Sequence, residues 1–190
     1  MILRIDHVAL AVRDYDKALS FFTKLLGAIP GTYADDGHMK YLWQNMALGD
    51  LSRLELLTPT GDGSFLDGFL SNKQGGVHHI TMQTPDIYGA RKTLEKNNIP
   101  YFGFNDYGPI WKELFIHPRD AFGVLIQIAQ FEADDWLSPK VKMPGGKRWT
   151  VEKDGTEIHL TFAHPGGGKV RIDLSKAEAA GLIDDLKNAI

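Results

Sequence analysis

An internal repeat constrains the fold of this chain more than any other feature of its sequence. The segment Ile5–Val12 resembles Val77–Thr84, and the matched histidines, His7 and His79, stand 72 positions apart. Self-similarity at a fixed spacing indicates that one structural unit occurs twice. The apolar residues of both segments predict short, mostly buried strands at equivalent places in the two copies.

A helix is predicted after each of these strands. Asp14 and Asp86 each stand seven residues beyond the matched histidine, and aspartate is a favoured helix N-cap. The segments that follow, Lys17–Phe22 and Gly89–Leu94, continue as helix. Further strand-like stretches complete each half, so both halves are expected to run strand, helix, strand, strand, strand. These stretches are Ile29–Ala34, Met39–Leu48 and Leu54–Leu57 in the first half, and Tyr101–Phe104, Trp111–His117 and Ile126–Ala129 in the second.

Four polar side chains fall at two pairs of equivalent positions in this repeat. Besides His7 and His79 on the first strands, Glu55 and Gln127 stand 72 positions apart on the last strands, each between apolar residues. An unpaired carboxylate on a dry face is costly, so a shared role is favoured. A pseudo-two-fold axis would bring all four together inside one curved sheet. Two imidazoles, one carboxylate and one carboxamide suit one divalent ion of Zn, Co, Mn, Ni or Fe.

The predicted fold class is therefore α+β, with paired β-α-β-β-β modules forming a curved mixed sheet around a metal site. We expect this domain to span residues 1–130, as modules 1–58 and 77–130. The linker at 59–76 should hold a short helix within Ser64–Leu70.

The repeat stops after Gln130, and residues 131–190 are expected to form a C-terminal α+β extension of unknown role. It begins with a polar, proline-containing link and ends in a helix of about 15 residues capped by Ser175. Three strands are predicted between them. These strands lie near Trp149–Glu152, Glu157–Phe162 and Lys169–Asp173.

Composition excludes several kinds of partner and chemistry. The chain has 190 residues, 43% of them hydrophobic, which is enough for a buried core but not for more than two small domains. A net charge of -3 and a pI near 6.1 argue against nucleic acid as a partner, and the absence of cysteine excludes thiolate ligands.

Two further absences set the expected location and cofactors. No run reaches the roughly 18 apolar residues that span a bilayer, and no leader pattern precedes the first strand, so we expect a cytoplasmic protein without a membrane partner. No glycine-rich phosphate loop or concentrated basic cleft is present that would select among substrates, and the divalent metal is the one cofactor expected.

Five segments of the chain resemble motifs of a known family. They are Ile5–Ala9, Leu54–Leu57, Gly76–Ile80 and Phe115–Pro118 running on to Gly123–Gln127. Residues 1 to about 130 resemble the vicinal-oxygen-chelate (glyoxalase/bleomycin resistance/dioxygenase) superfamily, and within it the methylmalonyl-CoA epimerases and glyoxalase I-like members. The resemblance implies the paired-module fold and a metal held by His7, Glu55, His79 and Gln127. It selects His79 over its neighbour His78, as the repeat alignment also does.

The chain departs from the epimerases of that family in three ways. They tend to carry Gln on the last strand of the first module and Glu on that of the second, whereas here Glu55 precedes Gln127. The summed charge of the ligands is the same. Their second carboxylate base, on the third strand of the first module, aligns near His38 to Lys40, where no carboxylate stands. The extension is the third departure.

The resemblance implies a metal-dependent isomerase or lyase that moves a proton next to a carbonyl through a metal-stabilised enediolate, in an epimerase-like or glyoxalase-like reaction. Expected substrates are an acyl-CoA thioester, a hemithioacetal or another 2-oxo or 1,3-dicarbonyl compound, and a homodimer is expected by analogy. The candidate catalytic residues are Glu55, as the metal-adjacent base, Gln127, His38 and Lys40. His117 and Lys112 are secondary candidates.

Two alternatives remain open from the sequence. An iron-dependent dioxygenase would use His7, His79 and one carboxylate as a facial triad, although the family carries that carboxylate at the position of Gln127. A sequestering protein of the resistance type would bind a small molecule between the modules without a metal. A complete ligand set argues against this second alternative.

Overall fold

The computed structural model of the chain describes residues 2–48, 52–132, 147–163 and 169–190. These residues form two compact units. The first contains an eight-stranded sheet, and the second contains a three-stranded sheet with one helix. No helix in the described ranges is long and apolar enough to cross a membrane.

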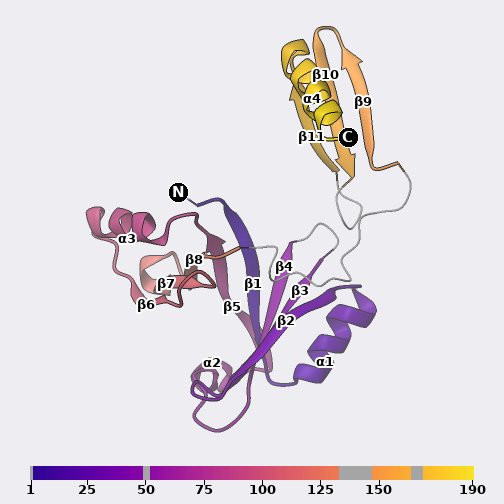
Figure 1. Cartoon of the computed structure of the whole chain (residues 1–190). Coiled ribbons are helices and arrows are strands. Elements are labelled where there is room, and N and C mark those ends of the chain that lie inside the picture. Colours follow the sequence, from indigo (N-terminus) through magenta and orange to yellow (C-terminus); the bar gives the residue numbers. More distant parts are fainter. Residues whose placement is uncertain (1, 49–51, 133–146, 164–168) are drawn as a thin grey trace. The chain divides into compact units, whose positions relative to one another are not determined.

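The first unit is built on one curved mixed sheet with the strand order β2-β3-β4-β1-β5-β8-β7-β6. Figure 1 shows β1 and β5 side by side at its centre, where they pair antiparallel. The strands are β1 (Arg4–Val12), β2 (Ile29–Asp36), β3 (Tyr41–Ala47), β4 (Arg53–Pro59), β5 (Gly75–Gln83), β6 (Phe102–Asp106), β7 (Lys112–Ile116) and β8 (Ile126–Gln130).

The two halves of this sheet repeat one order about a pseudo-two-fold axis between β1 and β5. β1 pairs in parallel with β4, and its counterpart β5 pairs in parallel with β8. At the centre His7 lies opposite Thr81, and Ala9 lies opposite His79. These two pairs are symmetric, because Thr81 is the repeat counterpart of Ala9. The predicted fold class, paired β-α-β-β-β modules in a curved mixed sheet, is confirmed.

The two aspartates that were predicted to be helix N-caps, Asp14 and Asp86, do cap helices. Asp14 precedes α1 (Tyr15–Ser20), which continues as a π-helical turn through Leu25, and its side chain accepts a hydrogen bond from Lys17 N. Asp86 does the same for α3 (Ile87–Lys96) through Gly89 N. Each cap satisfies one of the N–H groups that a helix start leaves unpaired. The predicted linker helix is α2 (Leu66–Leu70).

The core lies against both faces of the sheet. In the first module Leu56 packs on one face, with Leu19 of α1, and Leu57 packs on the other, with Leu70 of α2. Successive side chains of a strand point to opposite faces, so Glu55 shares the face of Leu57. Burying each leucine stabilises the fold by about 1.5–3 kcal/mol. Glu55 therefore lies on a strand whose apolar neighbours pack on both faces of the sheet.

The second unit consists of β9 (Trp149–Asp154), β10 (Glu157–Ala163), β11 (Lys169–Leu174) and α4 (Lys176–Asn188). β10 lies between β9 and β11 in an antiparallel sheet. Ser175 caps α4 through a capping box, in which Ser175 and Glu178 each accept a hydrogen bond from the other's backbone N–H. Most of the predicted proline-containing link, at 133–146, lies outside the described residues.

Candidate metal centre

Three of the predicted ligands meet on one face of the central strands. His7 comes from β1, His79 from β5 and Glu55 from β4. Ala9 is the common reference, because it lies opposite Glu55 in one pairing and opposite His79 in the other. His7 stands two residues from Ala9 and so points to the same face.

The ligand atoms of this cluster are close enough to share one ion. One carboxylate oxygen, Glu55 Oε2, lies 3.6 Å from His7 Nε2 and 3.8 Å from His79 Nε2. All three ligand atoms fall within 4.8 Å of one another. Both histidines are buried, at 2% and 6% exposure. We call His7, Glu55 and His79 the metal cluster.

A buried nitrogen without a hydrogen bond supports a metal at this point. Within the described ranges His79 Nε2 has no hydrogen-bond partner, although it is fully buried. The other ring nitrogen, Nδ1, lies 2.9 Å from His78 Nδ1. Burying an unsatisfied nitrogen is unfavourable unless it has another partner, and coordination would supply one. The donor set of the cluster, two imidazoles and a carboxylate, fits a divalent ion.

The ring of His7 is held by a chain of charged groups. His7 Nδ1 donates to Asp6 Oδ2 at 2.8 Å. The other oxygen of Asp6 accepts from Arg53 Nη2 at 2.5 Å and from Arg4 Nη2 at 3.1 Å. A carboxylate on Nδ1 fixes the tautomer of a histidine, so Nε2 of His7 is the atom that would coordinate an ion.

Gln127, the fourth predicted ligand, reaches the cluster through Thr81. Gln127 Oε1 accepts a hydrogen bond from Thr81 Oγ1 at 2.5 Å, and the same hydroxyl lies 2.8 Å from His7 Nε2. Thr81 is fully buried between the two. The Gln127 carboxamide oxygen therefore lies next to the metal cluster. It is hydrogen-bonded to Thr81, whose hydroxyl contacts His7.

Burial and neighbouring charges separate the pKa values of the cluster. Burial disfavours the cation of His7, but the Glu55 carboxylate and the hydrogen bond to Asp6 outweigh it and raise the pKa of His7 to about 9. Burial dominates at His79, and with repulsion from His7 it lowers the pKa of His79 to about 4 despite Glu55. Burial works against the Glu55 carboxylate, yet His7 and His79 hold its pKa below the ordinary value. Near neutral pH the metal-free cluster therefore pairs one cation with one carboxylate.

A residue that the sequence reasoning missed, Glu113, stands beside this cluster. It lies on β7, and its Oε2 accepts from Gln127 Nε2 at 2.7 Å and from Trp111 Nε1 at 2.8 Å. Its Oε1 accepts from Asn105 Nδ2 at 3.1 Å. Glu113 shares the face of Phe115, which lies opposite Gln127, and this pairing is visible in the structure but not in the sequence of either strand.

Tyr41, on β3, lies on the same face of the sheet as Glu55 and packs against the apolar core there. Its pKa is raised by burial first, and then by the carboxylates of Glu55, Asp36 and, more weakly, Glu113. The phenol therefore keeps its proton at neutral pH. Its ring packs edge-on against Phe65 at 4.9 Å between centroids.

Three other candidates lie away from the metal cluster. His38 and Lys40 are exposed near the turn between β2 and β3, where Lys40 Nζ donates to the carbonyl of Asp62 at 2.5 Å. Lys112 Nζ pairs with Asp106 Oδ1 at 3.3 Å. In the described parts of the chain, none of the three contacts the cluster.

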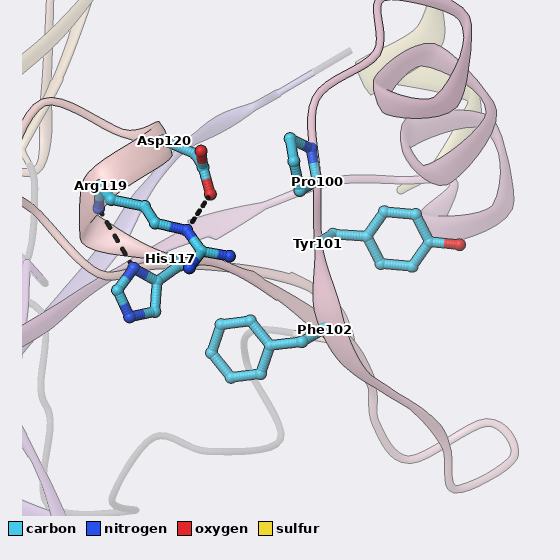
Figure 2. Close-up of a pocket in the computed structure, with 6 residues that line it drawn as sticks. All are labelled: Pro100, Tyr101, Phe102, His117, Arg119 and Asp120. Carbon is cyan, nitrogen blue, oxygen red and sulfur yellow. Dashed lines mark hydrogen bonds and ion pairs between the residues drawn. The ribbon is translucent and has the colours of Figure 1, made fainter.

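His117, the remaining candidate, lines a separate pocket of the second module (Figure 2). Its Nδ1 accepts a hydrogen bond from the backbone N–H of Arg119 at 3.2 Å, and Arg119 Nε donates to Asp120 at 3.2 Å. The other lining residues are Pro100, Tyr101 and Phe102. No member of the metal cluster lines this pocket.

Comparison with known proteins points to one superfamily. The sequence pattern of the Glyoxalase/Bleomycin resistance protein/Dioxygenase superfamily matches residues 6–108. Ethylmalonyl-CoA/methylmalonyl-CoA epimerase of Cereibacter sphaeroides is 36% identical over 134 residues, which cover 68% of this chain and 99% of that protein. Mitochondrial methylmalonyl-CoA epimerase of Mus musculus is 35% identical over 134 residues, 67% of this chain and 72% of that protein.

Solved structures share the fold of the first unit. Methylmalonyl-CoA epimerase from Mycobacterium tuberculosis superposes with a TM-score of 0.63 at 23% identity, covering 69% of this chain and 89% of that one. A variant of the Streptomyces coelicolor methylmalonyl-CoA epimerase, solved in complex with 2-nitronate-propionyl-CoA, gives 0.62 at 24% identity, covering 69% and 99%. At these identities the likeness establishes the fold alone.

Proposed function

Because this chain belongs to the glyoxalase/bleomycin resistance/dioxygenase superfamily, we propose that it is a divalent-metal-dependent epimerase acting at the carbon next to an acyl-CoA thioester carbonyl. One observation carries the proposal: His7, Glu55 and His79 converge on one point, where a buried His79 nitrogen has no hydrogen-bond partner among the described residues. The epimerase relatives support this reaction over the glyoxalase-like one.

The residues that would hold the ion are His7, Glu55, His79 and Gln127. When bound, a divalent ion acts as a Lewis acid that polarises the substrate carbonyl and so makes the neighbouring C–H bond more acidic. Asp6 orients His7 from behind, which leaves Nε2 directed at the site. The Gln127 oxygen, now bonded to Thr81, is the neutral member of the set.

The chain itself supplies a base next to the reacting carbon. The lowered pKa of Glu55 keeps its carboxylate ionised at neutral pH, as an acceptor of protons must be. Two imidazoles and one carboxylate leave the site with net positive charge once a divalent ion is present. That positive charge would stabilise the negative charge that develops on the substrate when its proton is removed.

The test is deuterium incorporation at the α carbon of methylmalonyl-CoA in D2O, followed by mass spectrometry. Protein loaded with Co²⁺ is expected to exchange this position, and a chelator should stop the exchange. His79→Ala and Glu55→Gln should lose both bound metal, measured by elemental analysis, and exchange. Glu95→Gln, on the exposed side of α3, is the control that should keep both. Metal-loaded wild type without exchange would exclude the reaction.

A second candidate function is an iron-dependent dioxygenase. The specific observation in its favour is that the metal cluster has two histidines and one carboxylate, which is the ligand set of non-haem iron oxygenases. Oxygen consumption by the Fe²⁺-loaded protein with catecholic substrates would support it. If these substrates do not change the rate of oxygen consumption, the dioxygenase function is excluded and the epimerase function is the one that remains.

We also propose that residues 131–190 form an extension separate from the catalytic domain 1–130, and that the chain forms homodimers in solution. The match to the Cereibacter protein supports the first point, because it spans 99% of that protein but 68% of this chain. Limited proteolysis tests the boundary, since cleavage should fall between the two compact units. Sedimentation equilibrium tests the dimer, and a mass equal to one chain would exclude it.

A further inference from the structure

The sheet of the second unit has two outer strands, because β9 and β11 each pair with β10 alone among the described strands. Backbone N–H and C=O groups at such an edge can pair with a strand of another chain. The described part of this unit also has little core, since Leu160 is the one apolar side chain in it that is less than a tenth exposed. A unit of this size with so little buried apolar surface gains stability from a partner.

The charged side chains of one outer strand, β11, are already paired within the unit. Arg171 Nε donates to Asp173 Oδ1 at 2.6 Å, and His159 Nδ1 of β10 lies 2.7 Å from the same oxygen. On β9 all six residues are exposed. Over the described ranges neither Lys153 nor Asp154 makes an ion pair, and the same is true of Arg148, which precedes the strand. The edge that still has unpaired charges is therefore that of β9.

The sequence of β9 is complementary to itself when a second copy pairs antiparallel with it. One register places Val151 opposite the partner's Val151, on a two-fold axis. In that register Arg148 faces the partner's Asp154, Trp149 faces the partner's Lys153, and Thr150 faces the partner's Glu152. Opposite charges, a cation against an aromatic ring and a hydroxyl against a carboxylate are all stabilising cross-strand pairs.

Neighbouring registers lack this complementarity. Side chains alternate between the two sides of a sheet, so a shift that keeps both sheets facing the same way is a step of two residues. A step in one direction sets Glu152 opposite the partner's Glu152, and a step in the other sets Lys147 opposite the partner's Lys153. Because like charges directly opposite destabilise a sheet, the pattern selects the register centred on Val151.

The apolar side of the sheet would continue across the same axis. Trp149 and Val151 are 49% and 60% exposed, and they lie opposite Phe162 and Leu160 of β10, with which they share one side of the sheet. The helix α4 packs against the other two strands, β10 and β11 (Figure 1). Exposed apolar side chains gathered on one surface mark a site of association. The contact of Val151 with its own copy would join the two apolar rows.

We propose that this chain associates with a second copy of itself through β9, so that two three-stranded sheets form one continuous antiparallel sheet of six strands about a two-fold axis at Val151. The occupant of the edge is another copy because the charges of β9 complement themselves. The inference names the surface of the homodimer proposed above and places it in the extension. It does not depend on the enzymatic reaction.

Sedimentation equilibrium of the full chain tests the charge pairs. Arg148→Glu and Asp154→Arg each set like charges opposite one another twice in a dimer, so each should lower the association constant at least about tenfold. The double variant restores opposite charges and should associate as wild type does. Within one chain these residues lie about 20 Å apart along the strand, so recovery requires contact between chains. Lys92→Glu, an equal change of charge at an exposed position of α3, is the control and should leave association unchanged.

A second measurement uses the absence of cysteine from the chain. Val151→Cys should give a disulfide-linked dimer on mild oxidation, because residues opposed at the axis lie within disulfide reach. Asp154→Cys should stay unlinked, since its two copies would lie about 20 Å apart. A wild-type mass equal to one chain would overturn both the homodimer and its surface. A dimer that none of the β9 substitutions weakens, or a double variant no better than either single one, would overturn the surface alone.

Discussion

Metal binding by this chain should release about one proton at neutral pH, and His7 should be its source. In the metal-free chain the pKa of His7 is raised to about 9, by Glu55 and by the hydrogen bond to Asp6 against the effect of burial. Only neutral imidazole coordinates a metal, so the proton must leave first. His79, with its pKa lowered to about 4, contributes nothing above pH 6.

The size of the effect follows from the distance between the working pH and the pKa of His7. At pH 7 that difference is about two units, so the apparent affinity should be about 100-fold weaker than at high pH, or about 2.7 kcal/mol. Affinity should therefore rise about tenfold for each pH unit from 6.5 upward and level off near the pKa of about 9.

Calorimetry of Co²⁺ binding in buffers of different ionisation enthalpy measures the released proton directly, and competition with a chelating dye gives the affinity at each pH. Asp6→Asn is the informative variant, because removing one of the groups that raise the pKa of His7 should move the levelling-off to lower pH. An affinity that stays constant between pH 6.5 and 8.5, with no proton released, would refute the reasoning.

Three further predictions concern stability. Leu114→Ala should lower the free energy of unfolding by about 2–5 kcal/mol in urea titrations, because Leu114 is fully buried in the second module; a loss below 1 kcal/mol would contradict this packing. Burial disfavours the Asp6 carboxylate, but His7 and Arg53 outweigh it and lower its pKa, so its stabilisation is complete above the ordinary aspartate pKa of 3.8 and disappears as the pH falls through the lowered value. Urea midpoints of wild type and Asp6→Asn should therefore converge in acid, and parallel curves would speak against it. Ser175→Ala should cost the second unit about 1 kcal/mol through loss of its cap, seen as a lower midpoint by circular dichroism, whereas an unchanged midpoint would show that the cap is redundant.

The repeat made the fold and most of the candidate site predictable from the sequence. One offset links His7 with His79 and Glu55 with Gln127, and the structure places all four on one face of the central strands. Their shared face was predictable because strand alternation is local and survives duplication. The caps of the helices were predictable for the same reason, since they depend on residues within one turn.

Glu113 was not predictable in this way, because it depends on how strands distant in sequence pair. Asn45 pairs with Glu55 in the first module, whereas Phe115, 70 positions later, pairs with Gln127, 72 positions later. The third strands are thus shifted by two residues relative to the repeat. Pairing register is set by packing across the whole sheet, so no single-strand pattern reveals it.

Because β1 pairs antiparallel with β5, the proposed metal site takes its ligands from both modules. His7 and Glu55 come from the first module and His79 from the second, so an ion bound there would close a loop of the 71 residues between the histidines. A chain without cysteine has no disulfide with which to restrain its unfolded state. In this protein the ion would act as the cross-link, and occupancy of the site would report whether the two modules are docked.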